Sequence, residues 1–140
     1  MNDNNFLRTG TLLKDDSYRI EAVLGSGGFG VTYRAVQVLL GKTVAIKEFY
    51  MGDYCVRDTD SLGVTVAVEK NVPLVERFKK KFLREARMVA QLANRHIIDI
   101  YDVFEENKTA YYVMEYLPGG CVEDYVSANG AIPEKEALEF

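Results

Sequence analysis

Alternating apolar and polar residues recur in several short stretches of this chain. These stretches are rich in β-branched and aromatic side chains, which is typical of strands with one buried face. The predicted strands cover residues 18–24, 31–38, 43–49, 97–104 and 109–117. Their order predicts a five-stranded antiparallel sheet. Within an insertion over residues 50–72, a short strand at residues 64–68 predicts a small additional hairpin.

One segment, from about residue 74 to residue 93, has the helical period instead. Its apolar residues recur at spacings of four, seven and three along one face, namely Phe78, Phe82, Val89 and Leu92. Glu85 falls in the middle of this apolar stripe. The opposite face, which we expect to be solvated, carries Lys79, Lys80, Arg84, Arg87 and Gln91. The pattern predicts one long helix packed on the sheet, followed by shorter helical pieces at residues 122–128 and from Pro133 onward.

Lys47 shares one face of its predicted strand with Ala45 and Phe49. A lysine among apolar neighbours is costly unless its charge has a partner, although an exposed lysine at a sheet edge remains an alternative. Glu85 is likewise a charged residue among apolar neighbours, on the helix, and its carboxylate needs a cation. We therefore expect Lys47 and Glu85 to form an ion pair, with nitrogen and oxygen within about 4 Å. Such a pair would orient the ammonium more than it would add stability.

A glycine-rich run joins the first two predicted strands, and Gly25, Gly27 and Gly30 form a G-x-G-x-x-G pattern in it. Glycines let a backbone approach a ligand closely, and backbone N–H groups suit phosphate oxygens. The same spacing occurs in dinucleotide-binding folds, in protein kinases and in ordinary hairpins. A helix follows the glycines in the dinucleotide fold. The strand-like residues after Gly30 favour the kinase arrangement.

Composition narrows the class of protein further. The 140 residues suit one small domain, and a hydrophobic content of 48% is enough for a core. The net charge of −4 gives no basic footprint for nucleic acid. The sequence contains no membrane-spanning apolar run and no secretory signal, and Cys55 and Cys121 do not form a metal-binding pattern. We therefore expect a cytoplasmic protein without a nucleic-acid partner or a membrane segment.

Four motifs occur in the order in which one family has them. They are Leu-Gly-Ser-Gly-Gly-Phe-Gly at 24–30, Val-Ala-Ile-Lys at 44–47, Phe-Leu-Arg-Glu-Ala at 82–86 and Val-Met-Glu-Tyr-Leu-Pro-Gly-Gly at 113–120. The chain resembles the N-terminal, ATP-binding lobe of a protein kinase, and most resembles bacterial serine/threonine protein kinases. The resemblance implies an α+β fold in which a five-stranded sheet and one long helix precede a hinge. It divides the chain into a lead-in at 1–17, the N-lobe at 18–117, and the hinge and first helices of a truncated C-lobe at 118–140.

The resemblance also implies an ATP site. Lys47 would hold the α- and β-phosphates, and Glu85 would orient Lys47, so these two residues form the implied catalytic pair. The phosphates would be covered by Gly25, Ser26, Gly27, Gly28, Phe29 and Gly30. The adenine and ribose contacts would come from Leu24, Thr32, Ala45, the gatekeeper Met114, the hinge residues Glu115 and Leu117, and Cys121 and Asp124 at the ribose edge. Thr32 replaces a usual valine, Cys121 replaces a more usual polar residue, and Asn94-Arg95-His96 replaces a common His-Pro-Asn turn.

The family's catalytic loop, His-Arg-Asp, and its magnesium-binding Asp-Phe-Gly do not occur in the chain. We therefore expect no metal site in this chain, and expect the Mg²⁺ ligands and the protein-substrate contacts in a missing C-lobe. The implied function is transfer of the ATP γ-phosphate to protein Ser/Thr hydroxyls. The truncated chain alone should be inactive, bind ATP weakly and be prone to self-association. A non-catalytic protein-interaction module is the alternative.

Overall fold

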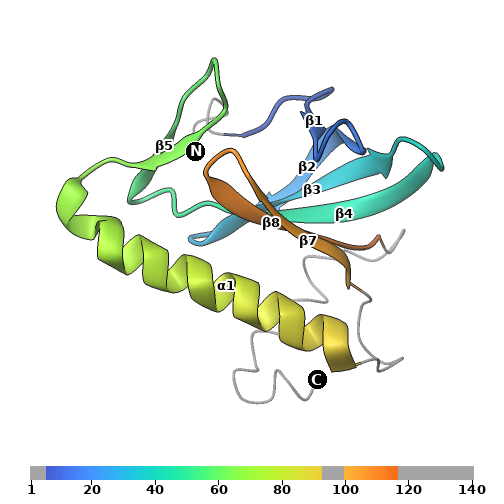
Figure 1. Cartoon of the computed structure of the whole chain (residues 1–140). Helices are drawn as coiled ribbons and strands as arrows, with labels where there is room; N and C mark the ends of the chain where they lie inside the picture. Colours follow the sequence, from blue (N-terminus) through green and yellow to red (C-terminus); the bar gives the residue numbers. More distant parts are fainter. Residues whose placement is uncertain (1–5, 93–99, 117–140) are drawn as a thin grey trace.

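The computed structural model describes residues 6–92 and 100–116. Two sheets and one long helix make up this part of the chain (Figure 1). The elements are β1 (Leu12–Leu13), β2 (Tyr18–Ser26), β3 (Gly30–Gln37), β4 (Lys42–Phe49), β5 (Cys55–Arg57), β6 (Val64–Val66), a 3₁₀ turn (Glu69–Asn71), α1 (Val72–Leu92), β7 (Ile100–Glu106) and β8 (Thr109–Glu115). The predicted helical pieces after residue 121 lie outside the described residues.

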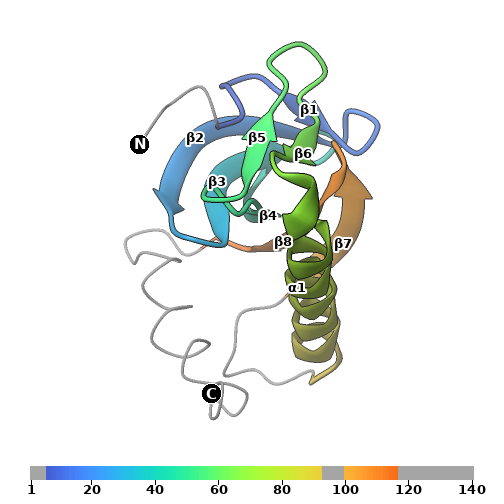
Figure 2. The same cartoon turned by 90° about the vertical axis from the view of Figure 1, so that its left-hand side faces the viewer.

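The main sheet is antiparallel throughout and has the order β1-β2-β3-β4-β8-β7. It curls strongly, so that β2 and β7 wrap around the central strands (Figure 2). The sheet has six strands where five were predicted. The extra strand is β1, whose Leu13 is 1% exposed in the core. Two residues are too few to show alternation, so the sequence pattern did not reveal this strand.

The insertion between β4 and α1 contains the predicted hairpin, formed by β5 and β6. The pattern predicted the second of these strands, but not the first. The hairpin's own pairing continues one step beyond the strands, where the Ala67 N–H donates to the Tyr54 carbonyl at 2.9 Å. The hairpin is tied to its surroundings because the Val64 N–H donates to the Asn107 carbonyl at 2.8 Å. It therefore packs against the turn between β7 and β8, and leads directly into α1.

Helix α1 covers Val72–Leu92, close to the predicted range, and contacts β7 and β8. Its buried residues include Val75, Leu83 and Ala86, while Phe78 and Phe82 are partly buried. Glu85 is exposed, so the prediction that it lies in the middle of the buried face is wrong. The predicted stripe omitted Val75, Leu83 and Ala86, and including them turns the buried face away from Glu85.

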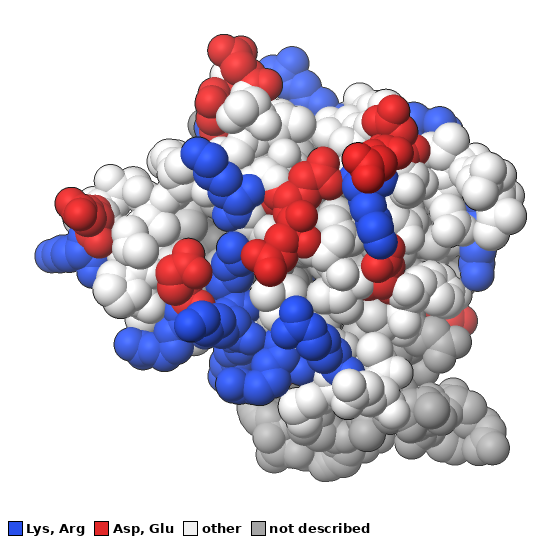
Figure 3. All heavy atoms as spheres, viewed as in Figure 1, with Lys and Arg blue, Asp and Glu red and all other residues white. Residues whose placement is uncertain are grey.

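The outward side of α1 is strongly basic, and its Lys and Arg side chains gather along the helix in Figure 3. The exposed basic residues of the helix are Arg77, Lys80, Lys81, Arg84 and Arg87. Lys79, predicted to be solvated, instead has a side chain only 17% exposed and forms an ion pair with Glu105 at 3.3 Å. Among the described residues, no helix combines the length and the apolar character needed to cross a membrane.

Candidate functional site

The glycine-rich run forms the turn between β2 and β3, two paired antiparallel strands. The Gly27 N–H donates to the Gly30 carbonyl at 2.9 Å and closes this turn. A strand follows Gly30, which confirms the predicted strand–turn–strand and rules out the helix of a dinucleotide-binding turn. Gly25 is half-buried, whereas Ser26, Gly27, Gly28 and Phe29 are exposed.

The surroundings of the glycines in this turn differ. A Cβ on Gly30 would lie 2.6 Å from the carbonyl oxygen of Glu48 and 3.5 Å from Cε of Lys47, so only glycine allows β3 to pack this closely on β4. A Cβ on Gly27 or Gly28 would meet nothing within 4 Å. Sterics within the protein therefore require Gly30, while Gly27 and Gly28 leave open space beside an exposed backbone.

An apolar cluster lies next to this turn on the sheet. Its buried members are Ala45, fully buried, and Met114, 2% exposed, which are paired across β4 and β8. The side chains packed against them are Leu24, Ile100, Tyr112 and Tyr116. The structure thus brings together three residues that the resemblance assigns to the adenine site, Leu24, Ala45 and Met114. Ile100 and Tyr116 were not predicted as site residues, although both lie within predicted strands.

Lys47 lies two residues after Ala45 on the same face of β4 and is half-buried. Its paired neighbours are Thr32 in β3, 2% exposed, and Tyr112 in β8. Glu115, the first predicted hinge residue, is half-buried at the end of β8. The other predicted contacts, Leu117, Cys121 and Asp124, lie outside the described residues.

The predicted ion pair between Lys47 and Glu85 is absent from the ion pairs of residues 6–92 and 100–116, and Glu85 is exposed. That prediction is wrong for this structure. An aromatic side chain occupies the interface between helix and sheet instead. Phe82 lies between Phe49 and Tyr112, with ring centroids 5.5 Å and 5.1 Å away. Bringing Glu85 toward Lys47 would require α1 to turn about its axis.

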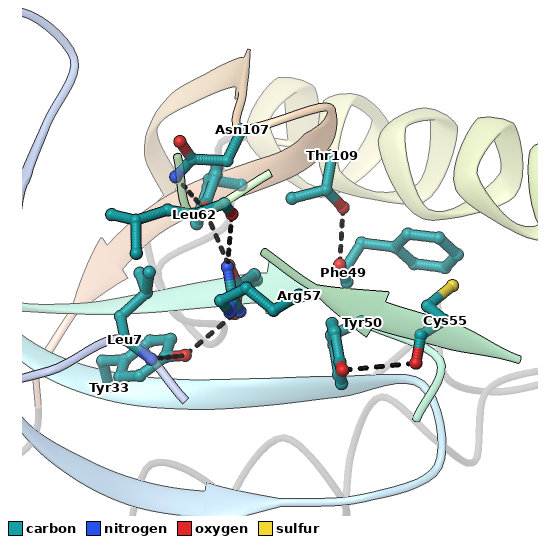
Figure 4. Close-up of polar contacts among 11 residues, drawn as sticks. Leu7, Tyr33, Phe49, Tyr50, Cys55, Arg57, Leu62, Asn107 and Thr109 are labelled. Carbon is teal, nitrogen blue, oxygen red and sulfur yellow. Dashed lines mark hydrogen bonds and ion pairs between the residues drawn. The ribbon is translucent and has the colours of Figure 1, made fainter. Parts of the chain in front are cut away.

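A buried polar network lies on the other face of β4, centred on Glu48. Two of its members, Tyr33 and Arg57, are labelled in Figure 4. The Glu48 carboxylate, fully buried, accepts hydrogen bonds from Arg57, Tyr33 and Tyr111. Burial and the negative charge of Glu48 raise the pKa of both tyrosines. Burial has the largest effect on Arg57 and would lower its pKa, but the charge and hydrogen bond of Glu48, together with Tyr33 and Tyr111, raise that pKa overall.

This network was not predicted, although the sequence contains one sign of it. Glu48 alternates with Lys47 and therefore shares a face with Val44 and Ile46, both buried in the core. A carboxylate among apolar neighbours needs a cation, by the reasoning that was applied to Lys47 and Glu85. The cation, Arg57, comes from β5, the strand that the pattern did not predict.

Comparison with known proteins places the chain in a family. The family model of the protein kinase domain matches residues 18–140. The chain is 35% identical over 123 residues to serine/threonine-protein kinase PrkC of Bacillus subtilis, and 31% identical over 131 residues to a probable serine/threonine-protein kinase of Clostridium acetobutylicum. These matches cover 88% and 94% of this chain, but only 16% and 17% of the two relatives.

A solved structure agrees with the sequence relatives. The apo form of PpkA-294 superposes with a TM-score of 0.78 and 28% sequence identity, covering 89% of this chain and 43% of that one. The overall fold is therefore shared with a solved structure. On the family match and this common architecture, the chain belongs to the protein kinase family.

Proposed function

We propose that this chain forms the ATP-binding lobe of a serine/threonine protein kinase, an enzyme that transfers the γ-phosphate of ATP to Ser and Thr hydroxyls of proteins. One observation carries the proposal. Ala45 and Lys47 lie on one face of β4, with the apolar cluster of Leu24 and Met114 around the first and Gly30 of the glycine-rich turn beside the second. An apolar slot next to a cation and a glycine-rich turn suits an adenine ring joined to phosphates.

Each part has a proposed role. Leu24, Ala45 and Met114 would enclose the adenine, with Thr32 beneath it and the Glu115 carbonyl at its polar edge. The exposed backbone at residues 25–29 would cover the phosphates, and Lys47 would neutralise them. Glu85 would orient Lys47 only after α1 turns, because it is exposed in this structure. Leu117, Cys121 and Asp124 remain proposed contacts of the hinge and ribose.

Magnesium needs ligands that this part of the chain does not offer. Within residues 6–92 and 100–116, no group of His, Cys, Asp and Glu side chains is arranged to hold a metal ion. The chain spans less than a fifth of the curated relatives it matches, and its sequence does not contain the His-Arg-Asp motif that the family resemblance implies. We therefore assign the Mg²⁺ ligands, the catalytic base and the protein-substrate contacts to the C-lobe of a complete kinase, and place the enzyme in the cytoplasm.

The test is a titration of the 140-residue chain with magnesium–ATP, followed by NMR chemical shifts. We expect millimolar binding, worth about 4 kcal/mol, with shifts at the glycine-rich turn and around Ala45 and Met114. Lys47→Met should abolish most of this binding. Lys42→Met is the matched control, because Lys42 begins the same strand but is exposed and contacts Tyr101.

Phosphoryl transfer is measured in parallel with radiolabelled ATP and a generic protein substrate. We expect no transfer by this chain alone, since positioning and metal charge neutralisation supply most of the rate. Equal responses of the Lys47 and Lys42 variants, or no shifts in the wild type at high millimolar ATP, would contradict the proposed site. That result would favour a non-catalytic interaction module, and gel filtration would then report its self-association.

A further inference from the structure

We propose that Glu48 and Arg57 are positioning residues for Lys47. Their buried ion pair holds β4 from the face opposite the nucleotide site, and so directs the Lys47 side chain toward the glycine-rich turn. The inference rests on the proposed role of Lys47 in binding phosphates. It assigns a purpose to the insertion between β4 and α1, which supplies Arg57.

The Glu48 carboxylate is held at both oxygens. Its Oε1 accepts a hydrogen bond from Arg57 Nη2 at 2.6 Å and another from the Tyr33 hydroxyl at 2.8 Å. Its Oε2 accepts one from the Tyr111 hydroxyl at 2.6 Å. The Glu48 side chain is fully buried and that of Arg57 is 1% exposed. Three donors from three different elements therefore fix this side chain in space.

Arg57 connects β4 to the hairpin of β5 and β6. Its Nη1 donates to the Leu62 carbonyl at 3.0 Å, which fixes the guanidinium within the hairpin (Figure 4). The guanidinium also lies 5.2 Å from the ring centroid of Tyr50, just after β4. Because the same hairpin is bonded to Asn107 and precedes α1, one guanidinium links the C-terminal end of β4 to the segment that leads into the helix.

The backbone on either side of Glu48 is also held. The Glu48 carbonyl oxygen faces Gly30 so closely that a Cβ there would lie 2.6 Å from it. The next carbonyl, that of Phe49, accepts a hydrogen bond from the Thr109 hydroxyl at 2.5 Å (Figure 4). β4 is thus fixed by β3, by β8 and by the hairpin at the residue that follows Lys47.

Consecutive residues of a strand point to opposite faces, so fixing Glu48 fixes the direction of the Cα–Cβ bond of Lys47. Among the described residues no ion pair involves Lys47, and its expected partner Glu85 is exposed. The orientation of the Lys47 side chain is therefore set by its Cα–Cβ bond and not by an ion pair at its ammonium. A buried ion pair contributes little net stability compared with apolar residues of similar size, whereas it can enforce a unique arrangement.

The decisive variant replaces both charges with apolar side chains, Glu48→Met together with Arg57→Met. Arg57→Met alone leaves a buried carboxylate without its cation and is strongly destabilising. The control is Leu13→Ala, which removes buried apolar volume from β1 but none of the hydrogen bonds to Glu48. Stability is measured by urea unfolding, so that effects on Lys47 can be compared at matched loss of stability.

Lys47 is monitored in two ways that need no nucleotide. One is the NMR signal of its Cε methylene, assigned with Lys47→Arg. The other is the rate at which its amine is acetylated by acetic anhydride, with release of acetate, and the modified residue is located by mass spectrometry. In the double variant we expect averaging of the methylene signals and a several-fold rise in acylation, with the fold retained. In Leu13→Ala both should match the wild type.

Wild-type behaviour of Lys47 in the folded double variant would overturn the proposal, as would an equal change in Leu13→Ala. Should the double variant be unfolded, Tyr111→Phe carries the test, because it removes one donor to Glu48 and should shift both signals in the same direction by less. The proposed function is judged separately by the ATP titration. Absence of ATP binding in the wild type would leave the Lys47 measurements valid.

Discussion

Phe29, at the tip of the glycine-rich turn, lies against Phe78 of helix α1 with ring centroids 5.2 Å apart. Phe29 is nevertheless 53% exposed, so the contact that holds the turn to the helix is only partly buried. A second bond supports this position, because the Tyr50 N–H donates to the Phe29 carbonyl at 3.0 Å. The turn that would cover the phosphates and the helix that carries Glu85 are therefore coupled through one aromatic pair.

Phe78→Ala should release the tip of the turn. We expect faster amide hydrogen exchange at residues 27–29 and a loss of unfolding free energy of about 1 kcal/mol from the aromatic pair, plus the burial that Phe78 itself loses. Met88→Ala, on an exposed site of the same helix, is the control and should change neither quantity. Unchanged exchange in the Phe78 variant would show that Tyr50 alone holds the turn.

Gly30→Ala and Gly28→Ala should separate stability from ligand binding. A Cβ on Gly30 meets the backbone carbonyl of Glu48 at 2.6 Å, so β3 and β4 must move apart, and we expect a loss of more than about 2 kcal/mol. A Cβ on Gly28 meets nothing, and the change in stability should be within about 0.5 kcal/mol. Urea unfolding measures both.

Gly28→Ala should also weaken nucleotide binding without a loss of stability. If the exposed backbone at Gly28 approaches phosphates, its methyl group should weaken the ATP-induced shifts although the fold is unchanged. A Gly28→Ala chain that binds ATP like the wild type would argue against phosphate contact at this residue.

Tyr111→Phe should be destabilising by about 2 kcal/mol, because it leaves Oε2 of the buried Glu48 without its hydroxyl donor. The substitution keeps the ring, so packing against Phe104 is retained. Tyr101→Phe is the matched control, since the Tyr101 hydroxyl is bonded only to exposed Lys42 among the described contacts. Equal effects of the two variants in urea unfolding would mean that the carboxylate finds another donor.

Alkaline pH should unfold the protein in a defined window. Burial, with a contribution from Asp102, raises the pKa of Tyr18 from 10.0 to about 12, and burial also raises the pKa values of Tyr33, Tyr50 and Tyr111. A raised pKa means that the folded state favours the neutral phenol. This stabilisation is complete below pH 10, where the tyrosines of the unfolded chain are also neutral. The contribution of Tyr18 to the free energy of unfolding is lost as pH rises toward 12.

We therefore expect the free energy of unfolding to fall above about pH 10, together with tyrosinate absorption in the ultraviolet. Tyr18→Phe should make the fall shallower between pH 10 and pH 12, because one ionising group is removed. An identical pH profile for the wild type and this variant would show that Tyr18 ionises without unfolding the chain.

Local patterns in the sequence were sufficient to predict most of the strands and the helix. Alternation predicted β2, β3, β4 and β8, the helical period predicted α1 within two residues, and the residues flanking Gly25 and Gly30 predicted a turn between strands. These features depend on the geometry of a few consecutive residues. The motifs at the glycine-rich turn and at Lys47 also indicated the family through their residue types and their order along the chain.

Local patterns could not predict which side of α1 is buried against the sheet. Consecutive helical residues differ by about 100° in direction, so an error of one position in the centre of the apolar stripe moves Glu85 from the buried face to solvent. Which position is central depends on where Leu83 and Ala86 meet the sheet. Only the packing of helix on sheet decides this.

The sequence by itself determined the strands other than β1 and β5, the turn, the helix and the residue types of the proposed ATP site. The tertiary structure decided which charges are paired. Glu48 finds its donors at Tyr33, Arg57 and Tyr111, which lie up to 63 residues away along the chain. No periodicity links such positions, because they meet only when the sheet curls and the insertion folds back over it. Burial then makes each contact obligatory, since a buried carboxylate is stable only when its partners surround it.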